Sequence, residues 1–101
     1  MMVEHIVLLK PKPEADDLRV AALWAGIAGL KGLVPGIVSI RLGPNTSPEE
    51  LAQGYNLGFV VTFESAAARD LYLSHPDHLA VVPLVHAVAE EVLVFDLERH
   101  K

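Results

Sequence analysis

The sequence predicts an α+β fold of the ferredoxin-like type, with elements in the order strand, helix, strand, strand, helix, strand (βαββαβ). Four apolar runs of strand length and two helical segments predict this order, and Pro or Gly residues stand at several boundaries. The pattern is typical of a four-stranded antiparallel sheet with both helices on one face. We expect residues 1–101 to form a single domain, because a second domain would have too small a core.

The first half of the chain carries two predicted strands and the longer helix. Alternating residues over 3–10 indicate the first strand, and Pro11 ends it because proline cannot donate to a sheet. A helix is predicted from Asp16 or Asp17 to about residue 33, with these acids at the positive end of its dipole. Residues 37–42 form the second strand. The helix buries a stripe at three- and four-residue spacing, made of Val20, Leu23, Trp24, Ile27 and Leu30.

Gly26 and Gly29 lie on a neighbouring face of this helix. Each glycine costs about 1 kcal/mol of helix stability relative to alanine. Close approach of another element is one explanation and a locally weak helix is the other. The sequence leaves both open.

The second half of the chain carries the other two strands. Ser47-Pro48-Glu49-Glu50 has the pattern of a helix N-terminus and predicts a short helical turn. The third strand is predicted over 55–63, and Ser65 is expected to cap a helix over 66–74. Pro76 then starts a further helical piece that Pro83 bends, and residues 92–97 form the last strand.

The predicted strands are apolar on both faces, as in Ile6-Val7-Leu8-Leu9 and Val92-Leu93-Val94-Phe95. An antiparallel sheet with one solvated face would alternate apolar and polar residues. Because the helices cover only one face, we expect a second copy of the chain to cover the other. The result would be a homodimeric α+β barrel with an apolar interior and an interface of about 1,600 Å² or more.

Composition excludes several classes of partner. The net charge is −5 and the 8 Lys and Arg residues form no cluster, which argues against nucleic acid. The chain has no cysteine, and its N-terminus lacks the pattern of a secretory signal, so we expect a cytoplasmic protein. The longest apolar run, near residues 57–63, is too short to cross a membrane.

The stretch Tyr72-Leu73-Ser74-His75-Pro76-Asp77-His78 concentrates proton-transferring side chains in a mostly aliphatic chain. His78 is either a general base aimed into a pocket or a histidine that closes a corner by bonding to the backbone. Tyr72 either donates to His78 or a substrate oxygen, or packs at a helix end. His5, on the inner face of the first strand, is either a core residue or part of the same pocket.

Metal binding is the rival use of these histidines. His75 and His78 are three residues apart, but the intervening proline disfavours a shared ligating face. No carboxylate at ligand spacing completes a set with His5. We therefore predict no metal site.

With these segments placed, the sequence resembles the stress-responsive α/β-barrel (Dabb) family of the dimeric α+β barrel superfamily. The resemblance covers residues 3–97. Its most specific part is a histidine in the first strand combined with Tyr-x-x-His-Pro-x-His. The matching residues are Glu4-His5-Ile6-Val7-Leu8, Val34-Pro35-Gly36, Gly43, Gly54-Tyr55, Val61-Thr62-Phe63-Glu64-Ser65, Tyr72-Leu73-Ser74-His75-Pro76-Asp77-His78 and Val94-Phe95-Asp96.

The family includes plant stress-responsive proteins and a plant polyketide cyclase that performs an intramolecular aldol condensation without metal or organic cofactor. The resemblance implies that His78 is the general base, Tyr72 the hydroxyl that orients it, and His5 a further pocket histidine. The cyclase has a tyrosine and a second histidine where this chain has Ile27 and Leu57. We therefore expect a more apolar wall, lined by Leu9, Ile27, Leu57, Phe59 and Val61.

Three functions remain open. The first is a cofactor-free, cyclase- or lyase-type enzyme, or a binder, for a small hydrophobic ligand that carries a carbonyl group. The second is a non-catalytic, stress-associated dimer whose polar cluster closes the end of the barrel. The third is a haem- or quinol-handling monooxygenase, which is disfavoured because Trp24 fits the helix core and no histidine stands out as an axial ligand.

Overall fold

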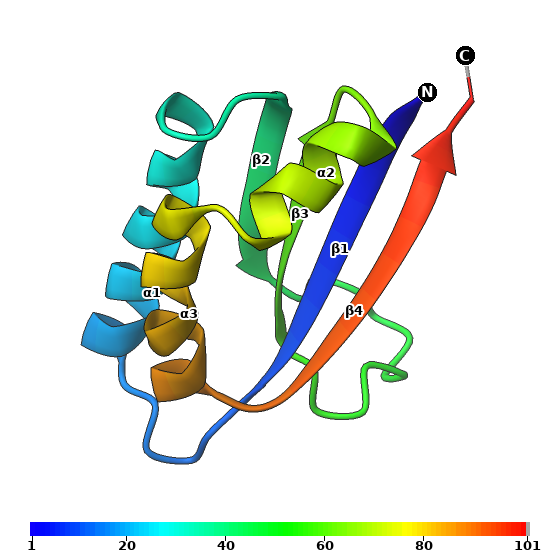
Figure 1. The fold of residues 1–101 in the computed structure, drawn as a ribbon. Coiled ribbons are helices and arrows are strands. Elements are labelled where there is room, and N and C mark those ends of the chain that lie inside the picture. The colour runs from blue at the N-terminus through cyan, green and yellow to red at the C-terminus, as the bar shows by residue number, and fades with distance from the viewer. Residues whose placement is uncertain (101) are drawn as a thin grey trace.

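A computed structural model describes residues 1–100 and contains one four-stranded antiparallel sheet with its helices on one face (Figure 1). The strand order is β2-β3-β1-β4, so β1 and β3 are central. This topology confirms the predicted ferredoxin-like α+β fold. The elements are β1 (Met2–Pro11), α1 (Asp17–Gly29), the 3-10 turn η1 (Leu30–Gly32), β2 (Ile37–Pro44), β3 (Leu57–Phe63), α2 (Ala66–Leu73), α3 (Pro76–Val88) and β4 (Ala89–Arg99).

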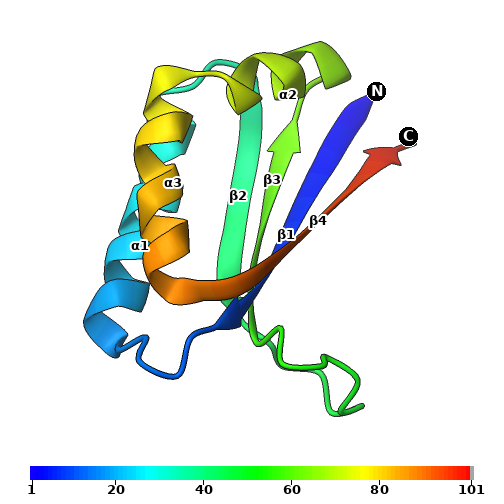
Figure 2. The same cartoon turned by 60° about the horizontal axis from the view of Figure 1, so that its bottom comes forward.

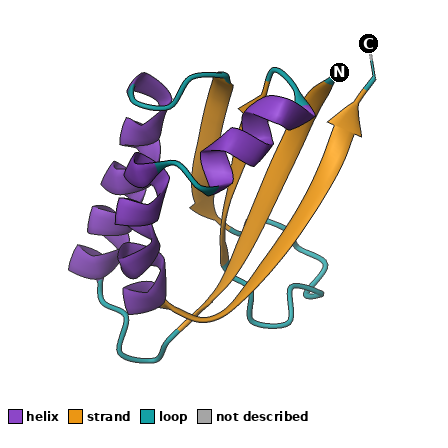
Figure 3. Cartoon of the chain, in the orientation of Figure 1, coloured by secondary structure: helices purple, strands orange, loops and turns teal. Residues whose placement is uncertain are grey.

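The helices and the sheet form two layers with the core between them (Figure 2). Helices α1 and α3 run side by side, and α2 lies across one end of the sheet (Figure 3). The alternation of β1 turns one set of side chains into this core. That set is Val3, His5, Val7 and Leu9, all buried.

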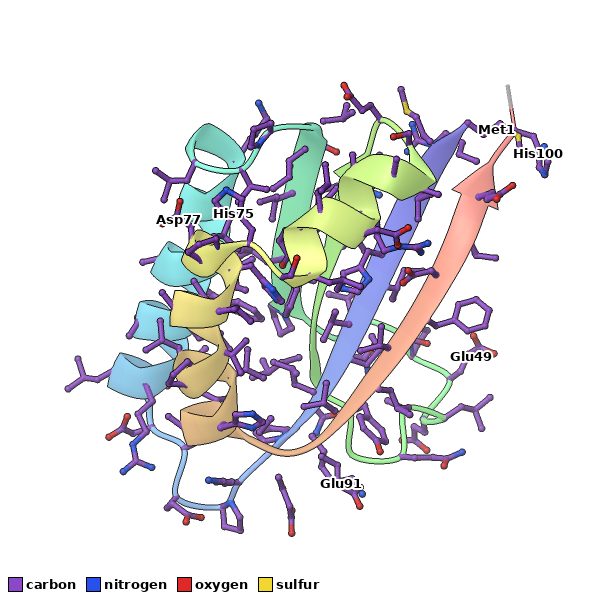
Figure 4. All side chains as sticks on the ribbon, viewed as in Figure 1. Met1, Glu49, His75, Asp77, Glu91 and His100 are labelled. Carbon is purple, nitrogen blue, oxygen red and sulfur yellow. The ribbon has the colours of Figure 1, made fainter. Side chains whose placement is uncertain are left out.

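Each α-helix begins at a capping side chain that accepts a backbone N–H. The carboxylate of Asp16 accepts from Arg19 at 2.9 Å, and the hydroxyl of Ser65 accepts from Ala68 at 3.1 Å. Nδ1 of His75 accepts from the N–H of Asp77 at 3.1 Å, and Figure 4 shows these two side chains at the start of α3. His75 is therefore occupied as a helix cap.

Close approach of α3 accounts for Gly26 but not for Gly29. A Cβ at Gly26 would lie 2.8 Å from Cδ1 of Leu84 on α3. A Cβ at Gly29 would meet no atom within 4 Å. Nothing in the packing explains the second glycine.

The helical turn predicted at residues 47–50 does not form, and this prediction was wrong. The Ser47 hydroxyl accepts from the N–H of Glu49 at 3.3 Å, but Glu50 has φ of 59°, in the left-handed region, so no helix can continue. The third strand also begins at Leu57 instead of residue 55. Tyr55 instead anchors the loop: its hydroxyl donates to Oε2 of Glu91 on β4 at 3.2 Å.

Two helix boundaries also differ from expectation. Helix α1 ends at Gly29 and the chain continues through the 3-10 turn η1, so the α-helix is shorter than predicted. Helix α3 runs through Pro83 without interruption from Pro76 to Val88. Its length matters for the site, because one face of it forms a wall of the cavity described below.

The sheet face opposite the helices is apolar and uncovered in the single chain. Large side chains of β4 are exposed there, including Phe95 with 60 % and Leu97 with 51 % of its surface accessible. Leu8 on β1 is also exposed. Among the helices of residues 1–100, none is both long and apolar enough to span a membrane.

Candidate functional site

The candidate site is a cavity of about 280 Å³ between α3 and the strands β1 and β4. Three residues predicted from the sequence, His5, Tyr72 and His78, all line it. They come from β1, the last turn of α2 and the first turn of α3. The remaining wall is almost entirely aliphatic or aromatic: Val7, Ile27, Phe59, Leu73, Val81, Val82, Val85, Val92 and Val94, with His86 at one end of the α3 face.

Tyr72 and His78 meet ring against ring. Their centroids are 4.1 Å apart and their planes make an angle of 32°. Tyr72 is 1 % exposed and also contacts the rings of Phe63 and His5, at 4.9 and 5.9 Å between centroids. Tyr72 therefore positions His78 by ring packing across the connection between α2 and α3.

Tyr72 lines the cavity, and no hydrogen bond of its hydroxyl is found among residues 1–100, so the hydroxyl is not fully buried. Within residues 1–100, every fully buried side-chain nitrogen or oxygen has a hydrogen-bond partner. Tyr72 is among the cavity-lining residues, and burial raises its pKa to about 12. At neutral pH it is thus a protonated phenol that can donate a hydrogen bond to a ligand oxygen.

The backbone fixes the tautomer of His78. Nδ1 of the ring lies 3.2 Å from the carbonyl oxygen of Leu73. A carbonyl can only accept, so Nδ1 carries the proton and Nε2 has the free lone pair when the ring is neutral. Burial, together with the neighbouring His5 and His75, lowers the pKa of His78. The ring is therefore neutral at pH 7, and Nε2 is its proton-accepting atom.

His5 is oriented by a chain of charged groups that the sequence did not reveal. Its Nδ1 donates to Oδ1 of Asp96 at 2.7 Å, and Nη1 of Arg69 donates to Oδ2 of the same carboxylate at 2.6 Å. Asp96 lies directly opposite His5 in the β1–β4 pairing. The Nδ1–H bond leaves Nε2 of His5 as the lone-pair nitrogen of the neutral ring.

The structure divides the five apolar residues expected in the pocket. Ile27 and Phe59 line the cavity with the three polar residues. Leu9 and Val61 are fully buried in the core, and Leu57 is partly buried against it. The cavity is displaced toward α3 and β4, so valines of these two elements take the places expected for them.

Asp96, Arg69 and His86 were missed as site residues. Asp96 is the lone acid of the predicted strand over residues 92–97, and Arg69 precedes the polar stretch by three residues. His86 is exposed but lies eight residues after His78 on the same helix. A helix of 3.6 residues per turn brings residues eight apart to a similar side, so this spacing was the available signal.

A second, larger hollow of about 820 Å³ lies mostly over the uncovered face of the sheet, under the loop of residues 45–56. Its lining includes Ile6, Leu8, Val60 and Leu93. It contains no histidine. The three predicted polar residues therefore converge on the smaller cavity and not on this one.

The described residues provide no ready-made metal centre. Within residues 1–100, no group of three or more His, Cys, Asp or Glu side chains is arranged to hold a metal ion. His5 faces a single carboxylate, and Asp96 is already bound by Arg69.

The protein is a ferredoxin-like α+β domain in which histidines and a tyrosine surround an apolar cavity. The chain belongs to the stress-responsive A/B barrel domain (Dabb) family, whose model matches residues 3–99. This membership confirms the resemblance identified from the sequence.

Two curated relatives and one solved structure show the extent of the similarity. The chain is 32 % identical over 94 residues to the stress-response A/B barrel domain-containing protein HS1 of Arabidopsis thaliana, covering 93 % of this chain and 86 % of that protein. It is 26 % identical over 101 residues to olivetolic acid cyclase of Cannabis sativa, covering 100 % of both. A dimeric ferredoxin-like protein of unknown function from Jannaschia sp. CCS1 matches with a TM-score of 0.87 and 34 % identity, over 98 % of this chain and 100 % of that one.

Proposed function

We propose that this chain is a cofactor-independent, cyclase- or lyase-type enzyme that acts on a small hydrophobic ligand carrying a carbonyl group. The supporting observation is that His5, Tyr72 and His78 line one apolar cavity. The likeness to olivetolic acid cyclase over the full length supports a cyclase-type reaction. The cytoplasm is the proposed location, on composition alone.

In this proposal His78 is the general base. Its Nε2 removes a proton from the carbon next to the carbonyl, and the electron pair moves onto the carbonyl oxygen. The protonated phenol of Tyr72 donates to that oxygen and stabilises the enolate. In a cyclase the enolate carbon attacks a second carbonyl of the ligand, and the proton on His78 then passes to the new alkoxide. His5 supplies further polar support.

The substrate is expected to differ from that of the cyclase. Ile27 and Phe59 give the cavity wall no polar group, and Leu57 lies against the core. A buried polar group of a ligand would find no partner along this wall, at a cost of about 1–3 kcal/mol. The proposal therefore favours ligands whose polar atoms are confined to their ends.

We further propose that two copies associate through the uncovered sheet face. Leu93, Phe95 and Leu97 of β4 are about half exposed there, and the 820 Å³ hollow continues the same apolar surface. A monomer rarely leaves so large an apolar patch in water. The relative from Jannaschia sp. CCS1, at 34 % identity, is described as dimeric, which supports the same assembly here.

The proposed base is tested by hydrogen exchange at carbon, which requires no knowledge of the natural substrate. A straight-chain methyl ketone is incubated with the protein in deuterated water, and loss of the proton signal beside the carbonyl is followed by NMR. We expect exchange faster than in buffer, and His78→Ala should reduce the protein's contribution by about 100-fold or more.

A matched control separates chemistry from folding. His100→Ala removes a histidine outside the cavity and should leave exchange unchanged. His78→Ala removes one backbone hydrogen bond and should lower the free energy of unfolding by about 1 kcal/mol. A large stability loss in His78→Ala, with no exchange by the unmodified protein, would favour the non-catalytic dimer.

A further inference from the structure

We propose that His86 is a second polar contact point in the cavity, and that the ligand is elongated, with an apolar middle and a hydrogen-bond-accepting oxygen at each end. The inner oxygen is the carbonyl beside Tyr72 and His78, and this part rests on the proposed function. The outer oxygen accepts a hydrogen bond from His86, and this contact has no role in catalysis.

Helix α3 presents a single continuous face to the cavity. Its lining residues are His78, Val81, Val82, Val85 and His86. The spacing of zero, three, four, seven and eight residues is that of one helical stripe. At a rise of 1.5 Å per residue, the two histidines are separated by about 12 Å along the helix axis. Three valines fill the interval between them.

The opposite wall, formed by β1 and β4, is polar only at its inner end. His5 pairs with Asp96 at the inner end, and the next residues of β4 that face the cavity are Val94 and Val92. Beyond the strand, the N–H of Lys12 donates to the carbonyl of Val88 at 2.8 Å, which ties the end of β1 to the end of α3. The cavity therefore follows α3 from the polar inner end to His86 with apolar side chains on both sides.

His86 is available for such a contact. Within residues 1–100, the histidines that form side-chain hydrogen bonds or ion pairs are His5, His75 and His78. His86 is exposed and takes part in none of them. A histidine ring offers an N–H donor in either neutral tautomer, so a hydroxyl, carbonyl or carboxylate oxygen could accept from it.

The test uses three ketones of equal chain length and reads binding alone. One is a plain methyl ketone, the second has a hydroxyl at its far end, and the third has a carboxylate there. Their dissociation constants are measured by calorimetry for the unmodified protein, His86→Leu and His100→Leu. The last variant removes a histidine that does not line the cavity.

We expect His86→Leu to weaken at least one of the two oxygenated ketones by about 5- to 10-fold while leaving the plain ketone bound as tightly or more tightly. His100→Leu should change none of the constants. A loss confined to the carboxylate ketone would assign an anionic ligand end, and a loss for both would assign a neutral oxygen acceptor.

Three results would overturn the inference. The first is equal loss for plain and oxygenated ketones in His86→Leu, and the second is no loss for any of them. The third is failure of all three ketones to bind. Because the His78 test reads proton exchange and this one reads affinity, the two can fail separately. A protein that catalyses no exchange but loses affinity for the oxygenated ketones in His86→Leu would refute the proposed catalysis and still support the role of His86.

Discussion

The imidazole of His5 and the carboxylate of Asp96 face each other across the pairing of β1 with β4, with Nδ1 and Oδ1 2.7 Å apart. The second oxygen of Asp96 accepts from Arg69 of α2 at 2.6 Å. One carboxylate therefore joins two strands and a helix around the inner end of the cavity. It also fixes which nitrogen of His5 is free.

Asp96→Asn should lower both stability and the order of the His5 ring. The amide loses the charge that strengthens both hydrogen bonds, and we expect the free energy of unfolding to fall by about 1–2 kcal/mol. Urea unfolding measures the loss, and the nitrogen chemical shifts of His5 report its tautomer. Asp70→Asn is the control, because Asp70 also binds Arg69 but its side chain is 66 % exposed. Its effect should stay below about 0.5 kcal/mol, and equal losses in the two variants would contradict this role of Asp96.

Tyr72→Phe should separate the hydroxyl of Tyr72 from its ring. The ring is packed between Phe63 and His78, so phenylalanine retains the contacts and stability should change by less than about 1 kcal/mol. The rate of proton exchange beside the ketone carbonyl should nevertheless fall, because the hydrogen-bond donor to the carbonyl oxygen is gone. Tyr72→Ala removes the ring and should cost about 3–5 kcal/mol in urea unfolding. Unchanged exchange in Tyr72→Phe would remove the hydroxyl from the mechanism.

His78 should make the protein less stable in mild acid. Its pKa in the folded protein is lowered by burial, so the unfolded chain binds a proton at a higher pH than the folded one. Stability is therefore lost as pH falls from about 6.5 toward the folded-state pKa, and is constant in this respect above that window.

The contribution of His78 is obtained by difference. Urea unfolding between about pH 5 and pH 8 should show a shallower fall in His78→Gln than in the unmodified protein, while His100→Gln keeps the original slope. A slope unaffected by His78→Gln would contradict the lowered pKa. The same shift predicts that exchange activity persists below about pH 6.5, since the base stays neutral there.

Phe95→Asp should convert the proposed dimer to a monomer. The side chain is 60 % exposed on the uncovered face of the sheet, so a charge there would be buried without a partner only in the dimer. Sedimentation at micromolar concentration measures the change. Leu18→Asp is the control, because Leu18 is 81 % exposed on α1, on the helical side. If the unmodified protein already sediments as a monomer, the proposed assembly is wrong.

The fold could be predicted because its determinants are local. Apolar runs mark the four strands, and Ser65 and Pro76 mark helix starts. The structure contains all four strands and begins α2 after Ser65 and α3 at Pro76. The failure at residues 47–50 is also local in origin. Ser47 and Pro48 favour a helix start, but Glu50 adopts a left-handed backbone and no helix forms, and the sequence pattern contains no sign of that.

The site could be predicted only in part, because it depends on contacts between distant segments. His5, Tyr72 and His78 stand out by residue type and converge on one cavity. Asp96 is recognisable only once the β1–β4 register is known, since its partner is 91 residues away. Leu9 and Val61 have the right chemistry for a pocket wall, but the packing of α1 and α3 on the sheet buries them in the core instead.

The pairing of β1 with β4 also sets when the site can exist. His5 is made before Asp96 and the valines of β4, which come from the last strand of the domain, and no cavity closes until that strand has joined the sheet. Such a long-range closure is slow compared with formation of the helices. Ligand binding therefore requires the fully paired sheet, and ketone affinity would serve as an assay for complete folding of the domain.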